Sequence, residues 1–159
     1  MITIHLLTLG KLKESFWREA EAEYIKRLQS WAKVVVHELR EESFTAKDSP
    51  DAIRNKEAVK LEAEMEKIGS AFVVVLDEHG AAQSSAQFSK KITSIIDTQN
   101  NHLVFVIGGP LGLGEGIRHR ANLLLSLSSF TFTHQMARVI LLEQLYRAMM
   151  IAHGRTYHY

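Results

Sequence analysis

Apolar residues follow two spacings along this 159-residue chain. Five short segments are mostly or wholly apolar, which is typical of strands buried on both faces of a parallel sheet. They are residues 2–9, 33–39, 71–76, 102–107 and 123–128. Between them we expect helices at residues 14–29, 51–68, 85–97 and 135–152, with a short one around 115–122. The alternation predicts an α/β fold, a mostly parallel sheet with helices on both faces.

Two of these helices begin with recognisable caps. Ser49 and Pro50 suit the N-cap and the first helical position of the second helix. Ser84 and Gln87 have the spacing of a capping box at the start of the third. Each cap lies within a residue or so of the point where the apolar pattern of its helix begins.

The strand ends predict where a ligand binds, because ligands of open parallel sheets lie outside the carboxyl ends of the strands. The segments at that edge are residues 76–80, 108–116 and 128–134. The second segment is rich in glycine but matches neither G-x-G-x-x-G nor the phosphate loop, since Glu115 stands where that loop needs lysine. It either presents bare backbone to a flat, polar-edged ligand or is a connection without one.

Composition narrows the class of protein. The length suits a single domain, residues 1–159. The chain has no cysteine, which excludes disulfides, thiolate metal sites and cysteine nucleophiles. No secretory signal and no apolar stretch of membrane-spanning length is present, so we expect a cytoplasmic protein without a membrane partner.

The charge is unevenly distributed, although the net charge is only +1. Residues 117–159 hold five of the 19 basic residues, all arginine, and one of the 18 acidic ones. An arginine-only cationic end suits bidentate contact with phosphates. The alternative is a chance fluctuation in a short segment.

The last helix is apolar on most sides rather than along one stripe. Its apolar residues are Met136, Val139, Ile140, Leu142, Leu145, Tyr146, Met149 and Met150. A helix of this kind is buried on most sides. It packs either against its own sheet and a second subunit, or as the central helix of a monomer.

Among the residue types that carry chemistry, one histidine stands out. His134 lies where the 128–134 loop meets the last helix, beside a candidate ligand site, although it could instead be a local cap. The serines at 126, 128 and 129 are more simply turn residues, and Glu143 with Arg147 is most simply an ion pair on the helix surface. No H-E-x-x-H or G-x-S-x-G motif occurs, and we expect no metal.

The C-terminal motifs resemble those of a known family. "VFVIGGPLGLGEG", then "SLSSFTFTHQMARVILLEQLYRA" and a terminal "TYHY" are similar to the RlmH family of SPOUT-class methyltransferases. The resemblance covers essentially the whole chain, including Gly10-Lys11 after the first strand and Leu76-Asp77 after the third.

The resemblance implies one SPOUT domain whose C-terminal part is threaded into a trefoil knot, an exception to unknotted topology. It implies a homodimer that uses S-adenosylmethionine. It also implies N3-methylation of a pseudouridine in 23S rRNA of the assembled ribosome. Two alternatives remain, a methyltransferase of the same fold acting on tRNA and a ribosome-associated binding module without activity.

The resemblance also carries residue roles. The implied cofactor contacts are Leu76, Gly108, Leu127, Ser128, Ser129, Phe130, Thr131 and Phe132. The catalytic candidates are His134, Arg138, Tyr157 and His158, and the candidates for rRNA phosphates are Arg118, Arg120, Arg147 and Arg155.

We expect His134 to act as the base or to orient the imide, and Arg138 to stabilise developing negative charge on oxygen. Tyr157 and His158 would complete the pocket for the target base, from this chain or from its partner. Two positions depart from the family pattern: Thr133 replaces a common proline, and the chain ends at Tyr159 where a basic residue is common.

Overall fold

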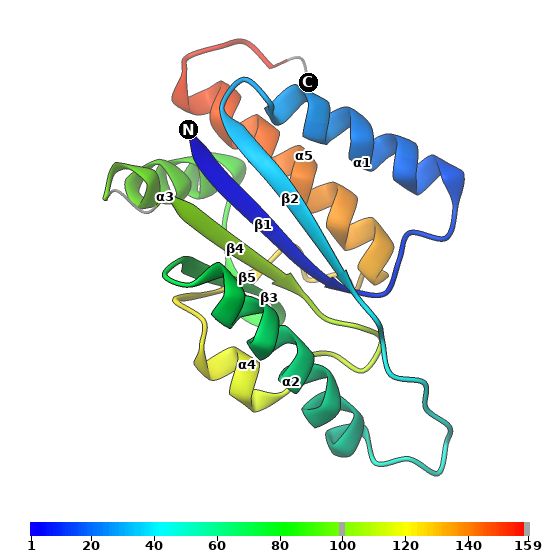
Figure 1. The fold of residues 1–159 in the computed structure, drawn as a ribbon. Helices are drawn as coiled ribbons and strands as arrows, with labels where there is room; N and C mark the ends of the chain where they lie inside the picture. The colour runs from blue at the N-terminus through cyan, green and yellow to red at the C-terminus, as the bar shows by residue number, and fades with distance from the viewer. Residues whose placement is uncertain (99–100, 158–159) are drawn as a thin grey trace.

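The computed structural model describes residues 1–98 and 101–157 and contains one five-stranded sheet (Figure 1). The strands are β1 (Ile2–Leu9), β2 (Ala32–Leu39), β3 (Phe72–Ala82), β4 (His102–Ile107) and β5 (Leu123–Ser126). Their order is β2-β1-β4-β3-β5, and every pairing is parallel. The predicted parallel sheet is confirmed, and its two most completely buried strands, β1 and β4, lie inside it.

Helices cover both faces of the sheet, as predicted. They are α1 (Ser15–Leu28), α2 (Pro50–Ile68), α3 (Ser85–Asp97), α4 (Glu115–His119) and α5 (His134–Ala152). One core joins the sheet to α1, α3 and α5, and a second joins the opposite face to α2 and α4 (Figure 1). No helix in the described part of the chain has the length and apolarity needed to cross a membrane.

The strand β1 shows why both layers form. Successive side chains of a strand point to opposite faces, so Ile4 and Leu6 enter the core with α5 while Leu7 and Leu9 enter the core with α2. All four side chains are fully buried. A strand that is apolar on both faces is stable only between two helical layers.

The predicted helix starts are confirmed. Ser49 is the N-cap of α2, where its side chain accepts a hydrogen bond from the backbone N–H of Ala52. Ser84 and Gln87 form the reciprocal bonds of a capping box at α3.

The end of β3 differs from the sequence prediction. The sequence predicts a loop at residues 76–80, but β3 continues past a bulge and pairs with β5 again at Ala81. Gly80 makes this close approach feasible, because a Cβ there would lie 2.7 Å from backbone atoms of Leu124 and Leu125. The threading of the C-terminal part into a trefoil knot stays a prediction.

The helix α5 is central within its own chain. It packs between α1 and α3 on one face of the sheet, which covers most of its apolar residues (Figure 1). Met136 and Ile151, near its two ends, remain exposed. Its all-round apolar character is therefore explained without a second subunit, and the homodimer stays a prediction.

A row of histidines crosses three neighbouring strands on the α2 face. The ring of His5 on β1 is hydrogen-bonded to His37 on β2 and to His102 on β4, each at 3.0 Å between nitrogens. The other ring nitrogen of His37 bonds to Glu64 of α2 at 2.9 Å. Burial, followed by the neighbouring His37, His102 and then Lys33, lowers the pKa of His5 to about 4. The described residues contain no group of three or more side chains arranged to hold a metal ion.

Candidate active site

One large cavity lies at the carboxyl ends of β3, β4 and β5 and has a volume of about 1160 Å³. Its walls come from the segments 76–79, 107–115 and 125–134, together with the first turns of α2. The structure thus brings the three segments selected from the strand ends around one space. That volume is large enough for a nucleoside-sized ligand.

Seven of the eight predicted cofactor contacts line this cavity. They are Leu76, Gly108, Leu127, Ser128, Phe130, Thr131 and Phe132. Ser129 is exposed and is not part of the wall. Phe130 lies at the mouth, with 83% of its surface exposed.

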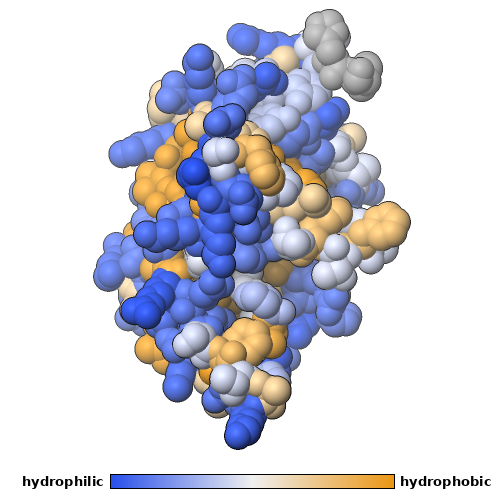
Figure 2. All heavy atoms as spheres, turned by 90° about the vertical axis from the view of Figure 1, so that its right-hand side faces the viewer, coloured by the Kyte–Doolittle hydropathy of each residue, from blue (hydrophilic) through white to orange (hydrophobic). Residues whose placement is uncertain are grey.

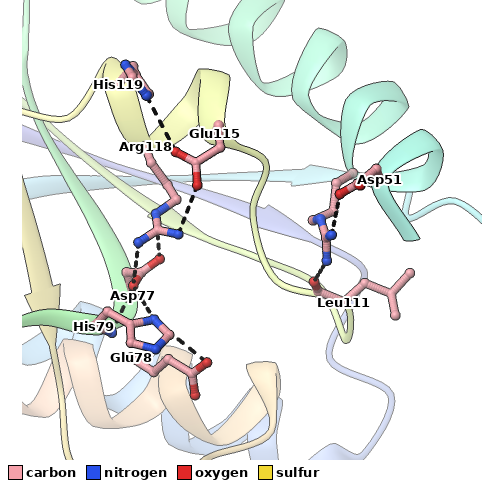
Figure 3. Close-up of polar contacts among 9 residues, drawn as sticks. Asp51, Asp77, Glu78, His79, Leu111, Glu115, Arg118 and His119 are labelled. Atoms are coloured by element: carbon pink, nitrogen blue, oxygen red, sulfur yellow. Dashed lines mark hydrogen bonds and ion pairs between the residues drawn. The ribbon is translucent and has the colours of Figure 1, made fainter. Parts of the chain in front are cut away.

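The glycine-rich wall is a tight turn held by α2. The N–H of Gly112 donates to the carbonyl of Gly109 at 3.0 Å, and Gly112 has a φ of +76°, which favours glycine. Arg54 donates to the carbonyl of Leu111 at 3.1 Å and is itself paired with Asp51 (Figure 3). The turn is therefore held by α2, and its residues line the cavity together with Asp51 and Arg54.

Charged groups of both signs face the cavity from its other side. The Nε of Arg118 lies 3.2 Å from a carboxylate oxygen of Asp77, and its Nη1 lies 3.3 Å from Glu115 (Figure 3). His79 and His119 approach the same two carboxylates. Arg118, predicted to contact RNA, thus points into this cluster with its charge already paired.

His134 lies in the cavity wall as the first residue of α5. Thr133, not His134, is the cap, because its hydroxyl accepts from the N–H of Met136 at 3.3 Å. A proline at 133 would provide no such side-chain oxygen. Burial is the main cause that lowers the pKa of His134, while Glu41 opposes it and Lys13 and Arg138 reinforce it. A neutral imidazole at the cavity wall can accept a proton.

Arg138 lies one turn further along α5 but does not reach the cavity wall. Its buried guanidinium makes two bonds to Glu21 of α1 and lies 2.9 Å from Glu38 of β2. A third nitrogen donates to the hydroxyl of Thr8 at 3.4 Å. This corrects the predicted contact with the reacting oxygen, because Arg138 instead ties α5 to α1 and to the sheet.

Tyr157 lies at the opposite end of α5. Its ring packs edge-on against Tyr146 at 5.2 Å between centroids, and the guanidinium of Arg147 lies 4.2 Å from its centroid. Burial, a hydrogen bond to Glu143 and the neighbouring Tyr24 raise the pKa of Tyr157. The 19 residues of α5 span about 28 Å at 1.5 Å per residue, so one chain does not bring Tyr157 to His134. His158 lies outside the described residues.

The four arginines predicted to contact RNA do not form one surface. Arg118 and Arg120 belong to the α4 layer, where Arg120 pairs with Glu66 at 3.5 Å. Arg147 pairs with Glu143 at 2.6 Å, and Arg155 lies 5.5 Å from the ring of Trp31, both on the α5 side. The four arginines lie close together in sequence, but in the structure the sheet separates the pair near α4 from the pair near α5.

The sequence prediction missed the part of the cavity wall that comes from α2. Asp51, Arg54 and Asn55 come from the first turns of α2. The sequence shows them only as polar positions of a helix, and no local signal reveals that this helix begins beside the glycine turn.

Comparison with known proteins agrees with this geometry. The family described as "Predicted SPOUT methyltransferase" matches residues 2–158. The chain is 42% identical to the ribosomal RNA large subunit methyltransferase H of Desulforamulus reducens, with 99% of each chain covered. It is 41% identical to the protein of that name from Streptococcus suis, with 98% of each covered.

A crystal structure of a probable methyltransferase from Bordetella pertussis Tohama I has a TM-score of 0.56 to this chain. The two share 12% identity, and the match covers 92% of this chain and 95% of that one, which shows a common fold. Near full-length relatives at about two-fifths identity, and a family match over almost every residue, agree with the motifs in the sequence. This chain belongs to the RlmH family of SPOUT methyltransferases.

Proposed function

We propose that this protein transfers a methyl group from S-adenosylmethionine to N3 of a pseudouridine in the 23S rRNA of the assembled ribosome. Membership in a family whose relatives are named ribosomal RNA large subunit methyltransferase H supports the substrate class. The observation that carries the proposal is the cavity at the strand ends, with His134 in its wall. Such an enzyme works in the cytoplasm, where ribosomes are.

The residues of the cavity fit S-adenosylmethionine. Leu76, Leu127 and Phe132 provide apolar walls for a flat ring, and the turn from Gly108 to Gly112 provides backbone groups for its polar edge. The arginines of the cavity already pair with its carboxylates, and the carboxylates are in excess, so the net negative charge suits the positive sulfonium and ammonium groups of the ligand. The acids are Asp51, Asp77, Glu78 and Glu115, and the arginines are Arg54 and Arg118.

The chemistry divides between the ligand and the chain. S-adenosylmethionine supplies an electrophilic methyl group, and the imide N3 of pseudouridine must lose its proton to attack it. His134 takes that proton, since its lowered pKa keeps the imidazole neutral near pH 7. Arg138 is a positioning residue, because it fixes the first turns of α5 and with them the direction of His134.

A homodimer would complete the site. Tyr157 lies a helix length away from His134 in the same chain. We propose that a partner chain brings its own C-terminal tail, with Tyr157 and His158, to this cavity to hold the target base.

The direct test is transfer of a labelled methyl group to ribosomes that lack the modification, compared with free 23S rRNA and tRNA. We expect label in ribosomes, on N3 of pseudouridine, and none in tRNA. Label in tRNA alone would favour a tRNA methyltransferase. An inactive binding module would transfer no label, and failure of S-adenosylhomocysteine to stabilise the protein would argue against the enzyme, because a ligand at 100 times its Kd adds about 2.7 kcal/mol.

A further inference from the structure

The connection from β1 to α1 lies next to His134, which is part of the cavity wall. We call residues 10–18, "GKLKESFWR", the β1–α1 corner. A Cβ on Gly10 would lie 3.4 Å from Nε2 of His134, and the N–H of Lys13 donates to the side chain of Gln135 at 3.0 Å. The β1–α1 corner therefore touches the first two residues of α5.

The backbone of the corner is held in place. Gly10 has a φ of +85°, and its N–H donates to the carbonyl of Leu39 at 2.8 Å. Arg18 donates to the carbonyls of Leu12 and Lys13 at 3.0 and 2.7 Å, and the Leu12 side chain is buried. A corner fixed in this way presents its remaining side chains from a rigid base.

Those side chains include two free cations. Lys11 and Lys13 are exposed, and no carboxylate in the described part of the chain forms an ion pair with either. Glu14 is the single acid within the corner, whose three basic residues leave it with a charge of +2. By contrast, Arg118, Arg120 and Arg147 already pair with acids.

Aromatic side chains lie beside these cations. Phe16 has 57% of its surface exposed, and its ring lies 5.1 Å from that of Trp17. Figure 2 looks onto the side of the molecule that carries the corner, and there apolar side chains form separate islands among hydrophilic ones. A polar face with exposed aromatics and unpaired lysines suits single-stranded nucleic acid better than an apolar protein partner.

We propose that the β1–α1 corner is a docking surface for the substrate RNA. Lys11 and Lys13 contact phosphates of the target strand next to His134, and Phe16 stacks on an unpaired base beside the target. This inference rests on the proposed function and adds to it a surface that the cavity does not include.

The test compares K11Q/K13Q with the matched control K90Q/K91Q, two exposed lysines of α3 that also have no carboxylate partner among the described residues. Binding of each protein to unmodified ribosomes is measured with S-adenosylhomocysteine present, over a range of salt concentrations. We expect K11Q/K13Q to bind about tenfold more weakly at physiological salt, and its salt slope to fall by about 1.4, since each single-strand phosphate contact contributes about 0.7. The control should bind like the wild type, and F16A should weaken binding several-fold.

Four outcomes would overturn the inference. K11Q/K13Q could keep the affinity and salt slope of the wild type, or K90Q/K91Q could lose as much. The wild type could fail to bind ribosomes at all. F16A could reduce the molar mass in light scattering while ribosome binding stays intact, which would make the corner an interface between two copies of the chain. Methyl transfer by the wild type, measured in parallel, separates failure of the docking surface from failure of the proposed function.

Discussion

The two ends of α5 have opposite character. Its first residue, His134, opens onto a cavity of about 1160 Å³ lined by backbone turns and paired charges. Beyond its last turn, the described tail folds back onto a cluster of rings, with Tyr157 against Tyr146 and His153 against Trp31. One end leaves a proton acceptor accessible, whereas the other covers its polar groups with aromatic surface. Chemistry and packing are therefore separated along a single helix.

The largest expected effect is on activity and comes from the end of α5 that faces the cavity. H134A should lower methyl transfer by about 100- to 10,000-fold, the usual contribution of a positioned base. H153A should leave the rate nearly unchanged, because His153 lies far from the cavity, hydrogen-bonded to the carbonyl of Met149 and packed on Trp31. Initial rates on unmodified ribosomes measure both, and equal losses would erase the contrast between the two ends.

The second largest effect is on stability and comes from Arg138, one turn after His134 in α5. R138M should lower the free energy of unfolding by about 3–5 kcal/mol, because it leaves the carboxylate of Glu21, whose side chain is 13% exposed, without its buried partner. The double variant E21M/R138M should recover most of that loss. Urea denaturation measures both variants, and a double variant no more stable than R138M would show that the pairing does not explain the cost.

The pH dependence of the rate probes the state of His134. The base works when neutral, and burial lowers its pKa below the ordinary 6.5. Activity should therefore be full above pH 6.5 and should fall as the pH drops through the pKa of His134, which lies below 6.5. E41Q should move this acid limb lower, since Glu41 raises the pKa, and K13Q should move it higher. A profile of kcat/KM against pH with its acid limb above 6.5 would contradict the assignment.

The smallest effect is on stability and comes from Thr133, the N-cap of α5. T133A should cost about 1 kcal/mol of stability, because the N–H of Met136 loses its side-chain acceptor. T133S keeps a hydroxyl and should lose much less. Thermal unfolding compares the stability of the two variants. Equal losses would mean that the cost comes from the methyl group, which both variants lose, and not from the capping hydroxyl.

Local patterns predicted most of the fold. The apolar segments of β1 and β4, the Ser84 capping box and the segments around the cavity all follow from residues near one another in sequence. The continuation of β3 to Ala82 did not, because polar residues after Leu76 end the apolar pattern and only pairing with β5 extends the strand.

Dependence on residues distant in sequence also explains why the predicted role of Arg138 differs from its place in the structure. Arg138 looks like a polar position on a helix, and its burial depends on Glu21, a residue 117 positions away. Likewise, nothing near Arg54 in sequence indicates that its side chain holds the glycine turn. The position of the cavity therefore follows from local sequence patterns, whereas the roles of the charged side chains around it depend on residues distant in sequence.

The histidine row across β2, β1 and β4 makes folding sensitive to acid through its central ring. In the folded chain, burial and the neighbouring rings of His37 and His102 lower the pKa of His5 to about 4. In the unfolded chain His5 returns to the ordinary value of 6.5. Unfolding in acid therefore takes up about one proton at His5, so the stability linked to this ring is full above pH 6.5 and is lost as the pH falls toward 4. The sheet that carries the candidate active site thus loses stability in acid through a ring that lies outside the cavity.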